Sequence, residues 1–269
     1  MKQLIKKMLE ILPAFLGTRL SFIDFKYRLG GSYSRSKLDA NTEQTQKNLF
    51  KYVLSIVKYC EENIPFYQNF YDKVNFNSSQ LKAFEDLVKI PVITKSDLQA
   101  VDFVHRVGAI ESGVETNTGG TSGQPLKLLL DSGAHAREWG HMHTIWENLG
   151  YKTSSIKLTL RGMNLGSKPI NYNFIHNEFQ VNAYCDFDLV VKSLDKTLSK
   201  YKIEYLHGYP SGIYEFLKNL QSKSPESLSK LKKNLKGVFF GSEYPAPIYR
   251  DYIEGLLNIP TISWYGHTE

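Results

Sequence analysis

A glycine-rich segment in the middle of the chain has the composition of a loop that binds phosphate. Residues 118–125 read Thr-Gly-Gly-Thr-Ser-Gly-Gln-Pro. Glycines let the backbone approach a ligand closely and adopt positive φ, and their uncovered amides can point at an anion. The neighbouring hydroxyl groups add further donors. The candidate phosphate-binding residues are Thr118, Gly119, Gly120, Thr121, Ser122 and Gly123.

This loop differs from the two most familiar phosphate-binding motifs. No Gly-Lys-Ser/Thr follows, as in a Walker A motif, and the glycines do not have the G-x-G-x-x-G spacing. A flexible turn between two strands is the alternative interpretation. A turn needs only one or two glycines, however, whereas here glycines and hydroxyl residues alternate over six positions. The composition therefore suits a triphosphate site, and the flexible turn stays open as the alternative.

Two later segments could belong to the same site. Gly241-Ser242-Glu243 follows a short apolar run, and the chain ends in Trp-Tyr-Gly-His-Thr-Glu at residues 264–269. Taken alone, the first segment is equally well explained by a turn between a strand and a helix. Glu269 alone could be a solvated chain end. The order of the segments along the chain gives them more weight.

In this order, the three segments resemble the motifs of the adenylate-forming superfamily. Residues 118–125 resemble its phosphate loop, 241–243 the segment that borders the adenine, and 265–269 its Tyr-Gly-x-Thr-Glu motif. Leu126 stands where many members have a lysine, and Lys127 comes one place late. That departure is common in the branch that contains phenylacetate–CoA ligase and CapK-like proteins, which is linked to surface polysaccharide gene clusters.

Three further segments extend the resemblance to that branch. Residues 64–67 resemble its Val-Pro-Tyr-Tyr, residues 90–98 its Leu-Pro-x-Leu-Thr-Lys-x-Asp-Leu, and residues 208–211 its Gly-Tyr-Pro-Ser. The resemblance therefore runs from about residue 50 to the end of the chain.

The resemblance implies a role for each residue of the last motif. Tyr265, followed by Gly266, would stack on adenine, Thr268 would contact the α-phosphate, and Glu269 would hold Mg²⁺. Mg²⁺ prefers carboxylate and phosphate oxygens, and with the loop amides it would offset negative charge built up on the α-phosphate. The implied reaction converts a carboxylic acid and ATP to an acyl-adenylate. The acyl group then passes to coenzyme A or another acceptor.

The family's large domain continues beyond this glutamate, and a small C-terminal domain follows it. These parts should supply an aspartate for the ribose and a lysine for adenylation, and neither follows Glu269 here. We therefore expect a fragment that is inactive alone. The first alternative is a non-catalytic, adenylation-like module that binds a nucleotide or a partner. The second is a membrane-associated acyl or glycosyl transferase that uses the basic N-terminal segment.

Alternating strand and helix patterns predict an α/β fold with largely parallel sheets flanked by helices. We expect residues 41–269 to form a partial adenylation domain, after an N-terminal amphipathic helix and irregular segment in residues 1–40. A helix should end at Pro65, and short helices and turns should fill residues 66–117. The expected strands are 126–130, 156–160, 203–206, 238–240 and 261–264. The expected helices are 133–149, 189–201, 246–257, one capped by Ser211 and one starting at Pro225.

Composition limits the class of partner. The net charge is +6, but the lysines are scattered and no nucleic-acid-binding motif accompanies them. No run reaches the roughly 18 apolar residues of a membrane span. Apolar residues at helical spacing in residues 4–16 could pack on the protein or make a peripheral membrane contact through residues 1–16. Two cysteines far apart in the sequence are typical of a protein in the reducing cytoplasm. Formation of a homodimer is a separate question that the sequence leaves open.

Overall fold

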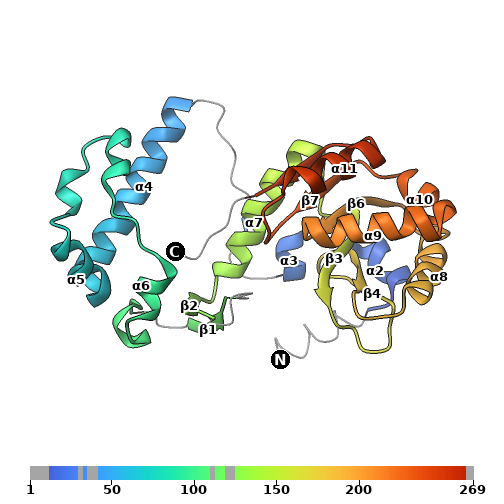
Figure 1. The fold of residues 1–269 in the computed structure, drawn as a ribbon, viewed down its shortest axis with the longest axis horizontal. Coiled ribbons are helices and arrows are strands. Elements are labelled where there is room, and N and C mark those ends of the chain that lie inside the picture. The colour runs from blue at the N-terminus through green and yellow to red at the C-terminus, as the bar shows by residue number, and fades with distance from the viewer. Residues whose placement is uncertain (1–11, 30–32, 35–41, 110–112, 119–124, 265–269) are drawn as a thin grey trace. The chain divides into compact units, whose positions relative to one another are not determined.

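The computed structural model describes residues 12–29, 33–34, 42–109, 113–118 and 125–264. The chain divides into two compact units (Figure 1). Unit 1 comprises residues 1–36 and 136–266, and unit 2 comprises residues 37–135 and 267–269. Each unit has its own buried apolar clusters, so each is described separately.

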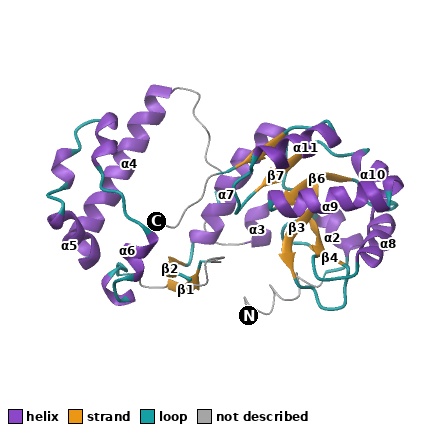
Figure 2. Ribbon diagram, in the orientation of Figure 1, coloured by secondary structure: helices purple, strands orange, loops and turns teal. Residues whose placement is uncertain are grey.

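Unit 1 is built on a six-stranded sheet, whose strands are orange in Figure 2. The strand order is β4-β5-β3-β6-β7-β8. Strands β5, β3, β6, β7 and β8 run parallel, and β4 pairs antiparallel with β5 at one edge. The strand bounds are β3 Ile156–Met163, β4 Ile170–Asn173, β5 Glu178–Asn182, β6 Ile203–Gly208, β7 Gly237–Phe240 and β8 Thr261–Ser263. The largely parallel α/β architecture expected from the sequence is confirmed.

Helices cover both faces of this sheet. The helices that return the chain from one parallel strand to the next all contribute to one apolar cluster with Leu158, Leu206 and Val238. These helices are α8 Phe187–Leu198, α9 Pro210–Lys223, α10 Pro225–Lys232 and α11 Pro247–Leu257. The second cluster joins α7 Ala134–Trp146 and α3 Phe25–Leu29 to Tyr205 and Phe239 of the sheet. The two faces are therefore packed by different sets of helices.

Helix boundaries in unit 1 follow local capping chemistry. Gly150, at φ +74°, ends the helical segment that begins with α7, as a residue in the left-handed conformation does at a C-terminus. Pro225 occupies the first turn of α10, where its missing N–H costs nothing. Helix α8 begins two residues earlier than expected, because the Asp186 side chain accepts hydrogen bonds from the Asp188 and Leu189 amides.

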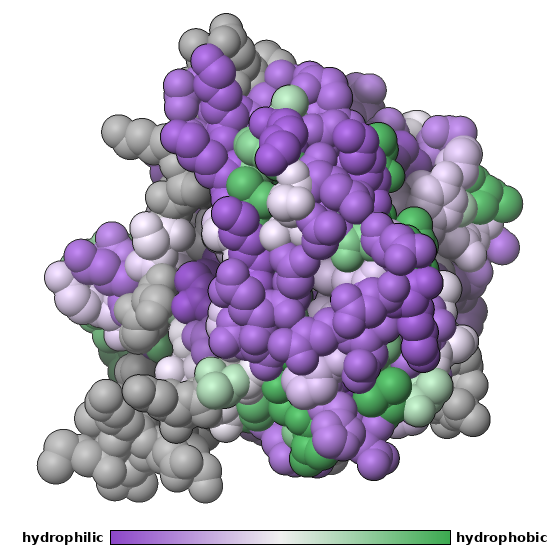
Figure 3. Space-filling model, turned by 90° about the vertical axis from the view of Figure 1, so that its left-hand side faces the viewer, coloured by the Kyte–Doolittle hydropathy of each residue, from purple (hydrophilic) through white to green (hydrophobic). Residues whose placement is uncertain are grey.

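Unit 2 is mainly helical, with one hairpin (Figure 2). Its elements are α4 Thr42–Asn63, α5 Pro65–Lys73, η1 Ser78–Gln80, η2 Phe84–Lys89, α6 Lys95–Gln99, η3 Phe103–His105, β1 Gly113–Asn117 and β2 Lys127–Asp131. Helix α4 ends before Pro65, as expected. Thr94 caps α6 in a reciprocal capping box with Asp97. The face of the molecule drawn in Figure 3 is mostly hydrophilic, with small separate apolar patches.

Residues 1–11, which hold most of the apolar positions expected at helical spacing in residues 4–16, lie outside the described residues. Leu12 packs against the apolar cluster of unit 1. Helix α2 (Ala14–Leu20) starts only after Pro13 and leaves Phe15 and Leu16 exposed. The segment expected to be irregular also contains α3, whose Arg28 donates to the backbone of residues 153, 174 and 175. Among the described residues, no helix is long and apolar enough to cross a membrane.

Candidate functional site

The base of the glycine-rich loop is a short antiparallel hairpin in unit 2. Strands β1 and β2 pair from Gly113–Asp131 to Asn117–Lys127. Thr118 then closes the loop, because its amide donates to the Leu126 carbonyl at 2.9 Å and its Oγ1 accepts from the Leu126 amide at 2.9 Å. The Thr118 hydroxyl hydrogen is left for another acceptor. Gly119, Gly120, Thr121, Ser122 and Gly123 lie outside the described residues.

The two residues after this loop are committed to contacts within unit 2. Leu126 is 1% exposed and packs with Ile64, Phe66 and Leu98. Lys127 pairs with Glu115 at 2.8 Å and places its Nζ 4.5 Å from the centre of the Phe103 ring. In this structure, neither residue 126 nor residue 127 supplies a free ammonium group to the loop. The position that holds a lysine in many adenylate-forming enzymes is a core position in this chain.

In unit 1, the other predicted segments follow the carboxyl ends of adjacent parallel strands. Gly208 ends β6, and Gly241 follows β7 directly. The Gly241 amide donates to the Gly208 carbonyl at 3.2 Å. A Cβ at Gly208 would overlap the Leu160 carbonyl oxygen of β3, so only glycine fits there. In open α/β sheets, ligands bind outside the carboxyl ends of the strands.

The turn after β7 holds Glu243 against the start of α9. Ser242 has φ +62°, a left-handed conformation that is uncommon for a residue with a side chain. Glu243 Oε2 then accepts from the Ser211 amide at 3.0 Å. A carboxylate there satisfies an amide that has no partner within the helix and interacts favourably with the helix dipole. Glu243 thus caps α9 from a distant part of the sequence.

The prediction that Ser211 caps this helix is wrong. Pro210 already occupies the first turn of α9, and Tyr209 is the N-cap residue without a side-chain cap bond. Proline at the first helical position has a φ suited to the helix. Ser211 therefore lies inside the helix and donates its amide to Glu243.

Trp264 lies beside Gly241 at the end of β8. A Cβ built on Gly241 would come 2.9 Å from Trp264 Nε1, so the absence of a side chain lets the indole approach the backbone. Trp264 Nε1 is buried and has no hydrogen-bond partner among the described residues. An unsatisfied buried donor costs free energy, which fits a polar group bound at this edge. Tyr265, Gly266, Thr268 and Glu269 follow Trp264 but lie outside the described residues.

Behind this edge, one face of the sheet carries a buried polar row that the sequence analysis did not identify. Thr159 of β3 lies in register with Gln180 of β5 and His207 of β6. Glu178 accepts from Thr159 at 2.7 Å and from Gln180 at 2.9 Å. Lys157 is fully buried, and its Nζ donates to the Tyr151 hydroxyl and the residue 176 carbonyl at 3.0 and 2.6 Å.

Burial sets the charge state of this row. It lowers the pKa of His207 to about 3, so the imidazole is neutral at pH 7. His207 Nδ1 is buried without a partner among the described residues. Burial also lowers the pKa of Lys157. For Glu178 burial alone would raise the pKa, but the nearby Lys157 charge and the Thr159 hydroxyl lower it. A negative carboxylate and a neutral imidazole therefore lie below the strand ends.

The structure brings together some of the predicted residues and leaves others separate. Gly241, Ser242 and Glu243 lie at one sheet edge with Ser211 and Trp264. Thr118 belongs to unit 2 and is described with that unit. In the part of the chain that the structure describes, no three histidine, cysteine, aspartate or glutamate side chains gather as a metal site. Glu269, the expected Mg²⁺ ligand, lies beyond that part.

Comparison with known proteins identifies the fold. No family model matches the chain, and no curated protein sequence matches it. Two solved structures of 2-hydroxyisobutyryl-CoA ligase are similar at 18% identity. One is an open conformation in complex with 2-HIB-AMP and CoA, with a TM-score of 0.61 over 90% of this chain. The other, in the postadenylation state with 2-HIB-AMP, has a TM-score of 0.62 over 91%.

The match is to part of each ligase. The chain spans 60% of the first ligase chain and 55% of the second. The ligases are acyl-CoA ligases of the adenylate-forming superfamily, and the part matched is their N-terminal α/β domain. The chain therefore has the mixed α/β fold of part of the N-terminal domain of adenylate-forming acyl-CoA ligases.

Proposed function

We propose that this chain is the part of an adenylate-forming enzyme that binds ATP and a carboxylic acid. The enzyme joins the acid to AMP, releases pyrophosphate, and passes the acyl group to coenzyme A or another acceptor. One observation carries the proposal. Residues 208–211, which resemble the branch's Gly-Tyr-Pro-Ser segment, and residues 241–243, which resemble the segment that borders the adenine, meet at the carboxyl edge of the parallel sheet through the Glu243–Ser211 hydrogen bond.

Each group of residues has a proposed part in binding. The loop 118–123 would surround the triphosphate with amide and hydroxyl donors, and its closing residue Thr118 keeps a hydroxyl hydrogen to give. The backbone of residues 241–243 would border the adenine, and Tyr265 would stack on it, with Gly266 leaving room. Thr268 would contact the α-phosphate. Glu269 would hold Mg²⁺, which supplies charge neutralisation at the phosphates.

Acid-dependent exchange of pyrophosphate into ATP tests this proposal. We would measure it over a panel of acids, with a protein that contains this chain and continues beyond Glu269, and with the 269-residue chain in parallel. We expect exchange with at least one acid for the longer protein and none for the chain alone. Glu269→Gln should abolish exchange, whereas Glu226→Gln, which removes an exposed carboxylate from helix α10, should not. Absence of both exchange and ATP binding in the longer protein would contradict the proposal.

A specific observation favours a second candidate, a non-catalytic module that binds nucleotide or a partner. Leu126 occupies the position of the usual phosphate-loop lysine and is buried, while Lys127 is paired with Glu115. A loop without this cation could bind a nucleotide and still fail to stabilise charge on the phosphates. The two candidates differ in one measurement. Nucleotide binding without exchange for any acid in the longer protein favours the module.

The biological setting is also a proposal. The segments at 64–67, 90–98 and 208–211 favour the phenylacetate–CoA ligase and CapK-like branch, and with it a role in surface polysaccharide synthesis in the cytoplasm. Exposed Phe15 and Leu16 support a peripheral membrane contact through the N-terminal segment. Flotation with anionic liposomes, with and without residues 1–16, tests that contact.

A further inference from the structure

A cavity lies on the opposite face of the sheet from the buried polar row. Its volume is about 270 Å³. It opens at the carboxyl ends of β3 and β5, between helices α8 and α9. This is a place where α/β sheets bind ligands. None of residues 118–123, 241–243 or 264–269 is among the described residues that line it, so the proposed nucleotide site does not account for it.

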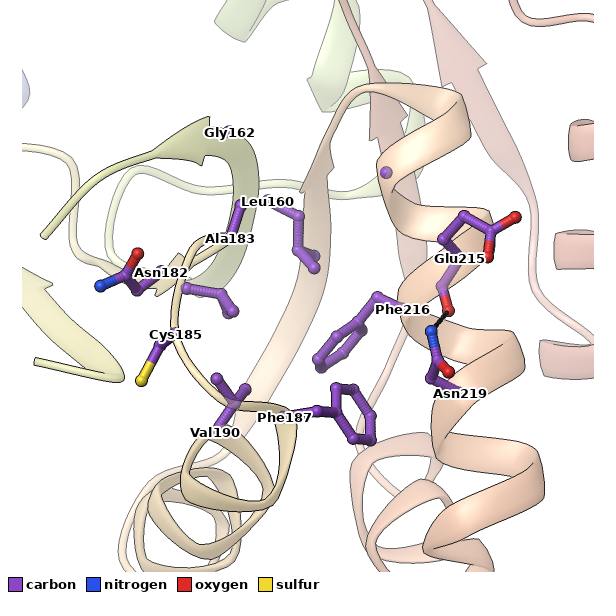
Figure 4. A pocket seen from close by; sticks show the side chains of 12 residues that line it. Leu160, Gly162, Asn182, Ala183, Cys185, Phe187, Val190, Glu215, Phe216 and Asn219 are labelled. Carbon is purple, nitrogen blue, oxygen red and sulfur yellow. Dashed lines mark hydrogen bonds between the residues drawn. The ribbon is translucent and has the colours of Figure 1, made fainter.

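The walls of this cavity are apolar side chains from four different elements. Leu160, Phe187, Val190 and Phe216 converge on a common space (Figure 4). Val181 also lines this space. The Phe187 and Phe216 rings meet edge to face, with centroids 6.2 Å apart and planes at 68°. All except Phe187 are less than 9% exposed. Such a surface favours an aromatic or branched aliphatic group, whose burial removes apolar area from water.

A glycine keeps the space open on the side of α9. Gly212 lines the cavity from the first turn of that helix. A Cβ there would meet only the Leu160 carbonyl oxygen and the Tyr209 Cβ, both at 3.8 Å, which is ordinary van der Waals contact. A Cβ can therefore be added at residue 212 without displacing backbone. Because Gly212 lines the cavity, a larger side chain at this position is the substitution chosen to fill it.

The size of the cavity sets the size of its occupant. An apolar cavity of about 150 Å³ lined by leucine, isoleucine and phenylalanine stays dry and binds benzene. A space of about 270 Å³ therefore accommodates a bicyclic ring system such as indole. A molecule of that size would extend from the apolar walls to the mouth.

The polar groups on α9 beside the mouth are hydrogen-bond acceptors. Glu215 is exposed and makes no ion pair with any described residue, and Asn219 uses its Nδ2 to donate to the Glu215 carbonyl (Figure 4). Asn219 Oδ1 and the Glu215 carboxylate are left to accept. A nearby cation, Lys223, holds its Nζ 5.4 Å from the centre of the Phe187 ring. The acceptor side favours a ligand head that donates hydrogen bonds.

We propose that this cavity is a binding site for a small amphipathic molecule with an aromatic or branched aliphatic body and an amino or hydroxyl head. The body lies among Leu160, Val181 and Phe216, and the head reaches the acceptors of Glu215 and Asn219 at the mouth. The site is independent of the nucleotide-binding motifs. It would act as an additional substrate or effector site.

Three probes with one ring system and different heads test the proposal. Tryptamine carries an ammonium head, indole has none, and indole-3-acetate carries a carboxylate. Calorimetric titration into the purified chain should give the tightest binding for tryptamine and the weakest for indole-3-acetate. Gly212→Leu should reduce the affinity for all three at least tenfold. Leucine is a better helix former than glycine, so this variant should fold.

Variants that remove one charge distinguish the contribution of the ligand's head to the affinity from that of its apolar body. Glu215→Gln should bring tryptamine to the affinity of indole, and Glu226→Gln, which removes an exposed carboxylate from α10, should leave the order unchanged. Binding that survives Gly212→Leu, or no binding of any probe to the unaltered chain, would overturn the site. Tighter binding of indole-3-acetate than of tryptamine would overturn the assignment of the head and point to Lys223.

Discussion

At the scale of single residues, the buried polar row makes the stability of the fold depend on pH. His207 is 3% exposed, and burial holds its pKa near 3. The unfolded chain returns this imidazole to a pKa of about 6.5. Between these two values the unfolded state binds more protons than the folded state. The free energy of unfolding should therefore fall as the pH drops below about 6.5.

His207→Gln should make stability less dependent on pH. One titrating group contributes at most about 1.4 kcal/mol per pH unit, so the unaltered chain should lose about 2 kcal/mol more than the variant between pH 6.5 and 5. Urea unfolding at several pH values measures this difference. The exposed His105→Gln serves as the control and should retain the slope of the unaltered chain. Parallel pH profiles for the two histidine variants would show that His207 is not the group responsible.

Alanine substitution at two glycines should change the free energy of unfolding in opposite directions. Gly208→Ala places a Cβ against the Leu160 carbonyl oxygen and must push β3 and β6 apart. We expect it to lower the free energy of unfolding by about 1–3 kcal/mol. Gly255, on the exposed side of α11, has no atom within 4 Å of a Cβ. Gly255→Ala should raise stability by up to about 1 kcal/mol through helix propensity. Equal effects in chemical denaturation would refute the close approach at Gly208.

At the scale of elements, the start of α9 depends on a carboxylate 32 residues away. The Ser211 amide donates to Glu243, and the helix has no local side-chain cap. Glu243→Ala should cost about 1 kcal/mol. Glu243→Gln keeps an acceptor but loses the charge, so its cost should be smaller. Hydrogen exchange at the Ser211 amide should accelerate in the same order, and unchanged exchange in Glu243→Ala would contradict the capping role.

The strands predicted from the sequence are those that alternate with helical patterns. Strands β6, β7 and β8 were predicted on this alternation, and residues 238–240 of β7 (Val-Phe-Phe) also form a short apolar run. Strands β1, β4 and β5 were not predicted, and β1 (Gly113–Asn117) lies where short helices and turns were expected. Strand β5 has five buried residues, but Glu178, Gln180 and Asn182 are polar. Their alternation with Phe179 and Val181 has the period of a strand, which was the available signal.

The sequence motifs of the candidate site could be predicted, but the contacts between their side chains could not. The resemblance of residues 208–211 and 241–243 to segments of one family indicated function, and the parallel sheet places them at one edge. The carboxylate of Glu243 at the start of α9 could not be read from either segment, because it depends on the Ser242 backbone conformation. Likewise, Leu126 is interpretable only with the residues that bury it. Contacts between a side chain and partners distant along the chain could not be predicted from the sequence.

At the scale of the whole molecule, the two units have separate apolar clusters. Their unfolding can be followed by different spectroscopic signals. Leu126 packs with Ile64, Phe66 and Leu98 in unit 2. The three tryptophans are residues 139, 146 and 264, and all belong to unit 1. Tryptophan fluorescence therefore follows unfolding of unit 1, whereas far-ultraviolet circular dichroism follows the helices of both units.

Leu126→Lys introduces the lysine that many adenylate-forming enzymes carry, but into a buried position. Replacing a buried leucine and burying an ammonium should cost at least about 3 kcal/mol. In urea, the circular dichroism signal should begin to fall at lower concentration, while the fluorescence midpoint stays within error of the unaltered chain. Leu158→Ala, in the apolar cluster of unit 1, should instead lower the fluorescence midpoint. A lysine variant that is fully stable and binds ATP more tightly would show that residue 126 can turn toward the loop, and would favour the catalytic candidate over the non-catalytic module.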